Sequence, residues 1–183
     1  MQIEGIISTG EAMFKKILAS VGIGAAKVDT ILETEHLYPG QKFQAQIIIE
    51  GGDVEQQVSG LELALMTRVK VESDDGEYFT NHVLDKWRIS EQFTIAPSEK
   101  KVIPFEARLH SETPITELNA GYNHSFVWIE TGLDIDLAID PNDKDTLHIY
   151  PNEAVKACMQ AMDKLGFSLV KADVEKGYLR ASS

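Results

Sequence analysis

KFQAQIIIE, residues 42–50, is the stretch that decides the fold class. Its apolar residues alternate with polar ones and fall on one face, at Phe43, Ala45, Ile47 and Ile49. An alternation of period two is typical of a strand that buries one face, because successive side chains point to opposite sides. We therefore expect a strand that covers an apolar core and needs partner strands beside it.

The neighbouring segments supply these partners. Further strand patterns occur at residues 27–37, 58–71, 87–95, 101–109, 124–131 and 146–150. Turn residues separate them, for example the Asp-Gly pair in SDDGE (73–77), which is typical of hairpins. About seven or eight short strands with no helix between them argue against βαβ units and predict a mainly β fold, an antiparallel β-sandwich.

Single residues within these strands carry further expectations. Pro104 cannot donate a hydrogen bond to a neighbouring strand, so its strand should lie at a sheet edge or be bulged there. Trp87, Phe105, Phe126 and Trp128 also fall in strand patterns. Because large aromatic side chains are mostly buried, we expect these four in the sandwich core and not on a stacking platform for sugar or base.

Two amphipathic helices are predicted to flank the strands. The first, residues 8–21, begins at the capping-box pair Ser8 and Glu11 and ends before Gly22. The second, residues 152–166, begins at an asparagine cap and ends at a glycine. The apolar stripe of this second helix contains Val155, Cys158 or Met159, Met162 and Leu165.

Cys158 is the only cysteine of the chain. Its position on the apolar stripe predicts a small core residue and not a nucleophile. A single cysteine excludes an intramolecular disulfide and a cysteine-based zinc site. It also fits a reducing, cytoplasmic location.

These patterns divide the chain into three parts. Residues 1–24 are expected to form an N-terminal extension with an amphipathic helix, and residues 25–151 the β-sandwich. Residues 152–183 are expected to form a helix and the start of a C-terminal β module. A lone pair of short strands is marginal on its own, so this tail should either pack on the sandwich or be the first part of a truncated module.

Composition excludes several classes of partner. The formal net charge is -12, whereas nucleic-acid binding needs a basic surface, so we expect no DNA or RNA partner. An anionic membrane surface is disfavoured for the same reason. No apolar run reaches the length of a membrane-spanning helix, and the start lacks the basic-then-apolar order of a signal peptide.

GIGAAKVDT, residues 22–30, resembles a phosphate-binding loop at first sight. A dinucleotide loop requires G-x-G-x-x-G between a strand and a helix, but Lys27 occupies the third glycine position. The loop also follows a predicted helix and precedes a strand, so no helix N-terminus can point its N–H groups at a phosphate. We expect a flexible joint here and no nucleotide cofactor.

The acidic run at residues 134–145 resembles a calcium loop but fails the required spacing. An EF-hand register from Asp134 puts Ala138 at position 5, and a register from Asp140 puts Lys144 there. Asp140 before Pro141 is instead typical of a turn, in which Asx side chains bond the nearby backbone. We expect no metal site.

No catalytic signature is present in the sequence. His36, His82, His110, His124 and His148 form neither H-x-x-x-H nor H-E-x-x-H, and there is no G-x-S-x-G serine motif. We therefore predict no catalytic, cofactor-binding or metal-binding residues. A site assembled across strands remains an alternative at this point.

Several long blocks of the chain resemble one known family. They are FKKILASVGIGAAKVDT (14–30), YPG (38–40), IEGGDVEQQVSGLELALMT (49–67), TGLDIDLAIDPNDKDTLHIYP (131–151) and MDKLGFSLVKADVEKGYLR (162–180). These blocks resemble the bacterial sporulation-control proteins of the stage-zero protein M type. The resemblance implies a cytosolic protein with an arrestin-like, immunoglobulin-like sandwich. Family members extend into a smaller C-terminal β module beyond GYLR, and the family has no established catalytic residues to transfer.

Two functional hypotheses follow from these observations. The first is a non-catalytic regulatory or scaffold protein that acts through protein–protein contacts, as the resemblance implies. The alternative is an enzyme or a ligand- or metal-binding protein with a site across the sandwich loops, for which His82, His124 and residues 134–145 are the candidates. Edge strands and amphipathic helices also favour a homodimer.

Overall fold

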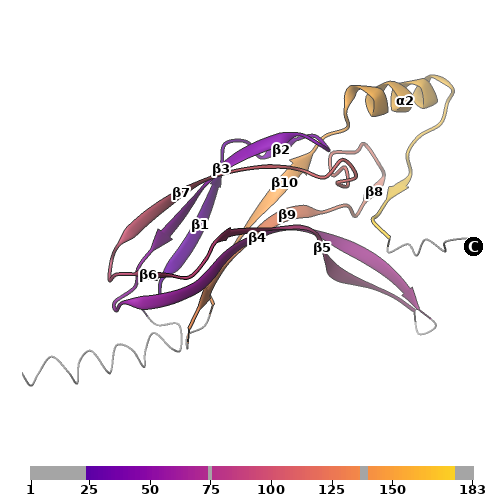
Figure 1. Ribbon diagram of the computed structural model, residues 1–183. Coiled ribbons are helices and arrows are strands. Elements are labelled where there is room, and N and C mark those ends of the chain that lie inside the picture. The colour runs from indigo at the N-terminus through magenta and orange to yellow at the C-terminus, as the bar shows by residue number, and fades with distance from the viewer. Residues whose placement is uncertain (1–23, 74–75, 137–139, 176–183) are drawn as a thin grey trace, which may run out of the picture.

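The computed structural model describes residues 24–73, 76–136 and 140–175. The predicted N-terminal helix, residues 8–21, lies outside these residues. Two β-sheets pack face to face, and a short helical segment follows them near the C-terminal end (Figure 1).

The smaller sheet is built around the alternating stretch at residues 42–50. Its strands, in the order β1-β3-β7, are β1 (Lys27–Leu32), β3 (Lys42–Glu50) and β7 (Lys100–Arg108). Both pairings are antiparallel. Every second side chain of β3 is buried, from Phe43 to Ile49, as its alternation predicts. β7 lies at the edge of this sheet, which confirms the prediction from Pro104.

The larger sheet contains the longest strands. In the order β2-β10-β9-β4-β5, they are β2 (His36–Leu37), β10 (Asn142–Ile149), β9 (Val127–Ile135), β4 (Gln56–Ser73) and β5 (Gly76–Ser90). β6 (Phe93–Ile95) also pairs with β4. The pairing of β10 with β2 is parallel, and the other pairings of this sheet are antiparallel.

The core fills the space between the two sheets. Leu61, Leu63 and Leu65 of β4 are fully buried and face the apolar side of β3 in one continuous cluster. Trp87 and Phe105 pack against this cluster, with ring centroids 5.8 Å apart. The expectation of a core position for these two aromatic residues is therefore correct.

The other two aromatic predictions need correction. Trp128 is buried, but strand alternation turns it away from the core-facing Val127 and Ile129. Lys144 covers it on this outer face, with Nζ 4.1 Å from the ring centroid. Phe126 is 43% exposed, so its assignment to the core is wrong.

Two strands differ from their predicted extent for a visible reason. β5 begins at Gly76, well before the predicted start at residue 87. The sequence pattern missed the first half of this strand because its residues are exposed on both faces and show no apolar alternation. β10 begins at Asn142, before the predicted start at residue 146. The pattern missed its first residues because the inward positions there carry Asp143 and Asp145 in place of apolar residues.

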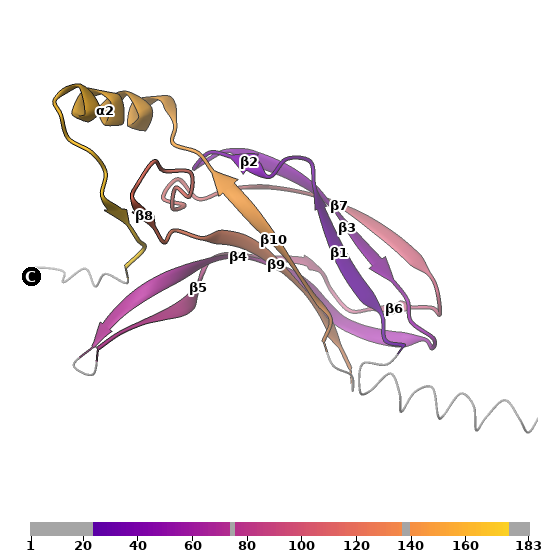
Figure 2. The same ribbon diagram turned by 180° about the vertical axis from the view of Figure 1, so that it is seen from behind.

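The segment after the sandwich is loosely attached to it. α2 (Glu153–Lys164) begins at Asn152, whose Oδ1 accepts a hydrogen bond from Val155 N at 3.0 Å. None of its residues is buried, and Figure 2 shows the helix apart from both sheets. β11 (Lys171–Ala172) then pairs in parallel with β8 (Tyr122–Asn123).

The exposure of α2 corrects a prediction. Cys158 is exposed, and so are Met162 (49%) and Leu165 (73%) on the same stripe. The sequence pattern was correctly interpreted as an amphipathic helix. Its apolar stripe, however, does not cover the sandwich core in the part of the chain that the structure describes.

Candidate functional site

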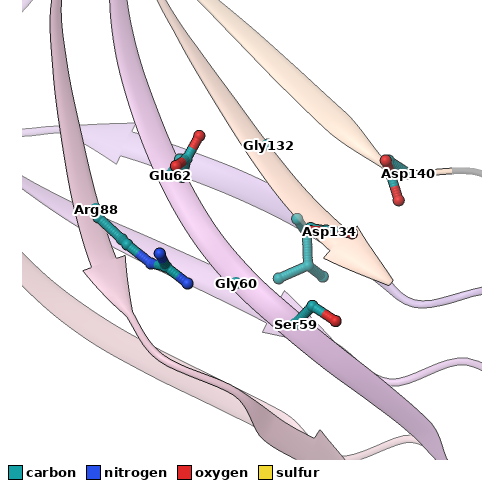
Figure 3. A pocket seen from close by; sticks show the side chains of 8 residues that line it. Ser59, Gly60, Glu62, Arg88, Gly132, Asp134 and Asp140 are labelled. Atoms are coloured by element: carbon teal, nitrogen blue, oxygen red, sulfur yellow. The ribbon is translucent and has the colours of Figure 1, made fainter. Parts of the chain in front are cut away.

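The outer face of the larger sheet carries a shallow pocket. Its residues are Ser59, Gly60, Glu62, Arg88, Gly132, Leu133, Asp134 and Asp140, and its volume is about 380 Å³. Figure 3 shows that these residues come from three neighbouring strands, with Asp140 at the rim. Gly60 and Gly132 create the hollow because neither has a side chain to fill it, and a Cβ at Gly132 would meet nothing within 4 Å.

Most polar groups at this pocket already have partners. Glu62 Oε2 pairs with Lys86 Nζ at 2.5 Å, and Asp140 Oδ1 accepts from the backbone of Ile135 at 3.0 Å. The second bond ties Asp140 back to Ile135 at the end of β9, five residues earlier in the chain. Ser59 Oγ donates to Asp136. No histidine or cysteine lines the pocket, so Ser59 has no general base beside it of the kind a serine nucleophile uses.

The candidates for a site across loops are not brought together. His82 lines a cavity of about 210 Å³ with His110 and Glu112. His124 instead lies against the ring of Phe79, at 6.0 Å between ring centroids. Among residues 24–73, 76–136 and 140–175, no group of three His, Cys, Asp or Glu side chains has metal-binding geometry.

The described end of the glycine loop, from Gly24 onward, makes hydrogen bonds to other parts of the chain. Gly24 has a φ of +68°, and its carbonyl accepts from Asp53 N at 2.8 Å. Ala26 N donates to Gln56 Oε1 at 2.7 Å. A Cβ at Gly24 would lie 2.5 Å from Asp53 Oδ2, so a carboxylate occupies the space beside this backbone. These contacts leave Gly24 and Ala26 poorly suited to hold a phosphate.

Two aspartates of β10 lie at the seam between the sheets. Asp143 Oδ2 accepts from Thr30 N of β1 at 2.7 Å. Asp145 Oδ2 is buried without a hydrogen-bond partner. Burial, followed by the charge of Asp143, raises the pKa of Asp145 to about 7. This seam is a sensitive point for stability, because a charged form of Asp145 is costly there.

The two sheets differ in how their outer edges are protected. The edge strand β7 carries Lys100, Lys101 and Pro104. Lysine and proline are residue types that natural proteins use on edge strands to prevent edge-to-edge pairing. On β5, the register with β4 shifts opposite Ile89 and Leu84, so the inner half of this edge is bulged. From Gly76 to Val83 the register continues without a bulge.

We call residues 66–73 and 76–83 the hairpin arm. Figures 1 and 2 show that it projects away from the body of the sandwich. β9 pairs with β4 only as far as Thr67, and beyond this point the backbone of Lys70 bonds to Val174 and makes an isolated bridge with Glu175. The arm thus leaves the two packed sheets and reaches the segment that follows β11.

The surface of the arm is aromatic and carries few free charges. Tyr78 is 53% exposed, Phe79 46% and Val83 45%. Lys70 Nζ binds Glu72 and Glu77, at 2.8 Å each, so these charges neutralise one another in part. Exposed apolar side chains on an open strand edge are typical of an interaction surface.

Sequence reasoning missed this arm. Residues 76–83 read GEYFTNHV, which has no alternation, no motif and no charge except Glu77. The aromatic pair Tyr78–Phe79, which follows the Asp75-Gly76 pair after one glutamate, was the one available signal. Only the structure shows that the sandwich ends before this pair and leaves it exposed.

A second apolar hollow lies beside α2. Leu118, Cys158, Met159, Met162, Phe167 and Leu169 surround a cavity of about 290 Å³, with Asn119, Asp163 and Ser168 at its polar positions. Flexible methionine side chains suit adaptable apolar contacts.

Comparison with protein families and known proteins gives a consistent result. Residues 14–183 match the family described as SpoOM protein. The sporulation-control protein spo0M of Bacillus subtilis (strain 168) is 36% identical over 165 residues, which are 90% of this chain and 62% of that protein. The crystal structure of Spo0M, sporulation control protein, from Bacillus subtilis superposes with a TM-score of 0.76 at 35% identity, over 82% of this chain and 60% of the other.

These matches confirm the predicted fold class, a mainly β arrestin-like sandwich, and the predicted family resemblance. This chain spans less than two thirds of the length of either relative. Within the part of the chain that the structure describes, no helix is long and apolar enough to cross a membrane.

Proposed function

The chain belongs to the SpoOM protein family, and from this membership we propose that it is a cytoplasmic regulator that acts by binding other proteins. The regulatory role follows from the sporulation-control relative, and the proposed mode of action is non-catalytic. The hairpin arm is the surface we assign to this binding.

One observation carries the assignment to the arm. β5 is the outermost strand of its sheet, and its residues 76–83 are all exposed, unbulged and free of proline and lysine. An open strand edge offers a row of backbone donors and acceptors, and an extended segment of a partner can pair with it. The charged and proline-bearing edge at β7 does not offer this.

Site-specific photocrosslinking tests the assignment. A photoreactive phenylalanine analogue replaces Tyr78 in one variant and Val102 in the other, inside the cells that naturally produce the chain. Val102 is a matched control, because it is 50% exposed and lies on the edge strand β7. We expect a discrete adduct with a second protein from position 78 and none from position 102.

A lysine introduced on the hairpin arm tests whether the crosslink at position 78 depends on strand pairing. Thr80→Lys places a lysine on the exposed edge, where charged side chains oppose strand pairing. We expect it to abolish the adduct from position 78 while the melting temperature changes little, since surface substitutions cost within about 0.5 kcal/mol. Equal adducts from both positions, or none from position 78, would contradict the role of the arm.

A homodimer stays a prediction. The open edges of β5 and β2 and the exposed stripe of α2 are the surfaces on which two copies could pair. Light scattering of the full chain measures its mass directly, and a monomer mass at high concentration would remove this prediction.

A further inference from the structure

Arg68 of the hairpin arm is held between two aromatic rings. Its guanidinium carbon lies 4.6 Å from the ring centroid of Phe79 and 4.4 Å from that of Phe126. Phe79 belongs to β5, whereas Phe126 directly precedes β9, so three segments build this clamp. Aromatic rings stack on the flat sides of a guanidinium, whereas its N–H donors lie in its own plane and stay available for hydrogen bonds.

The donors of Arg68 have no acceptor within the described residues. Arg68 Nε is buried and makes no hydrogen bond, and no ion pair involves its guanidinium. Arg108, in contrast, donates to the carbonyl of Gly40 at 2.6 Å. A buried donor without a partner is costly, and such a group in a native protein needs an explanation.

Three acidic side chains of the arm and of the segment beside it pair with lysines. Glu72 and Glu77 both bind Lys70, and Asp173 binds Lys171 at 2.6 Å. An unpaired arginine is unexpected in a chain with 29 acidic residues and a net charge of -12. Among residues 24–73, 76–136 and 140–175 no carboxylate pairs with Arg68, so its donors are available to an acid from another molecule.

The geometry points to a carboxylate site at Arg68: we propose that the clamp of Arg68, Phe79 and Phe126 receives an acidic side chain or a C-terminal carboxylate of the protein that docks on the hairpin arm. A planar carboxylate accepts two parallel hydrogen bonds from one guanidinium, which matches the in-plane donors. The exposed rings, 46% and 43% accessible, add apolar contact on either side. The proposal rests on the binding role of the arm.

An NMR titration tests this site without any partner protein. The ¹⁵N-labelled chain is titrated at constant ionic strength with N-acetyl-glutamate amide, which carries a side-chain carboxylate, and with N-acetylglycine, which mimics a C-terminus. N-acetyl-glutamine amide is the uncharged control. We expect the Nε–Hε resonance of Arg68 to shift and saturate with a carboxylate, while Arg88 and Arg108 report non-specific ion effects in the same sample.

The two carboxylate probes distinguish the two sources. Saturation with either one supports the site, and the tighter of the two identifies side chain or C-terminus. Equal shifts at all three arginines, or an equal response to the glutamine probe, would overturn the proposal. Saturation with inorganic phosphate but with neither carboxylate would also overturn it, in favour of a phosphate site.

Variants separate the clamp from general folding effects. Arg68→Lys keeps the charge but loses the two-point geometry, and we expect about tenfold weaker binding, read from the ring protons of Phe79 and Phe126. Phe126→Ala removes one ring and should weaken binding about two- to fivefold. Phe93→Ala removes a ring that lies under Lys101 instead, and should leave binding unchanged. An unaltered affinity in Arg68→Lys would contradict the site, whereas crosslinking from position 78 tests the arm separately.

Discussion

Single residues decide where side chains stabilise the folded sandwich and where they lower its stability. Ile47 and Leu63 are fully buried in the core between the sheets. Asp145 occupies an equivalent inward position on β10, but its carboxylate oxygen has no hydrogen-bond partner. Arg68 is the counterpart on the outer face, a half-buried cation that pairs with no acid among the described residues. Both residues carry uncompensated polar groups, which are costly in a folded protein.

The raised pKa of Asp145 predicts the direction of a pH effect. Burial raises this pKa from 3.8 to about 7, so between these values the folded protein keeps a proton that the unfolded chain has lost. The stabilising contribution of the protonated form is therefore fully present below the unfolded pKa and is lost as the pH rises through 7. Asp145→Asn should remove this loss of stability at high pH, because asparagine stays uncharged.

Thermal melts at pH 5 and pH 8 check this expectation. At pH 5 only part of this loss has occurred, so Asp145→Asn should melt only slightly higher than the wild type. At pH 8 it should melt roughly 2–4 °C higher, for about 1 kcal/mol after solvent screening of a partly exposed group. Asp134→Asn is the control, because Asp134 is exposed on the outer face. The same difference between wild type and Asp145→Asn at both pH values would refute the assignment.

At the scale of elements, the arm and α2 share one property. Both extend beyond the packed sheets. Neither the hairpin arm nor α2 contributes a residue to the apolar core cluster. α2 buries no residue and residues 76–83 of the arm are all exposed, so both should open locally at lower free energy than global unfolding. We therefore expect these elements to respond to substitutions locally.

The cap of α2 provides the corresponding prediction. Asn152→Ala removes the hydrogen bond to Val155 N and should cost the helix about 1 kcal/mol. Because α2 buries no residue, amide exchange within Glu153–Lys164 should accelerate about fivefold while the melting temperature of the sandwich stays unchanged. Asn119→Ala, a substitution of another exposed asparagine near α2, should change neither. A large fall in the melting temperature of Asn152→Ala would show that α2 and the sandwich unfold together.

At the scale of the whole molecule, stability resides in the two-sheet core. Leu63 is fully buried, whereas Met162 on α2 is 49% exposed. Both are large apolar residues, and their truncation to alanine compares the two regions directly. The same substitution should therefore have very different global effects.

Urea unfolding of the two variants measures this difference. Leu63→Ala should lower the free energy of unfolding by about 2–5 kcal/mol, because it leaves a cavity in the core. Met162→Ala should lower it by less than about 0.5 kcal/mol, as expected for an exposed site. Similar losses in both variants would mean that α2 belongs to the same cooperative unit as the sandwich.

The sequence by itself determined the fold class, because alternation along β3 and β4 requires a buried face and the lack of predicted helices between the strands argues against βαβ units. It also determined the edge position of the strand with Pro104, since proline cannot donate to the ladder. The tertiary structure alone decided what α2 covers, because an amphipathic stripe does not specify its partner. It alone placed Phe79 and Phe126 on either side of Arg68, since no local pattern encodes a contact between three separate segments.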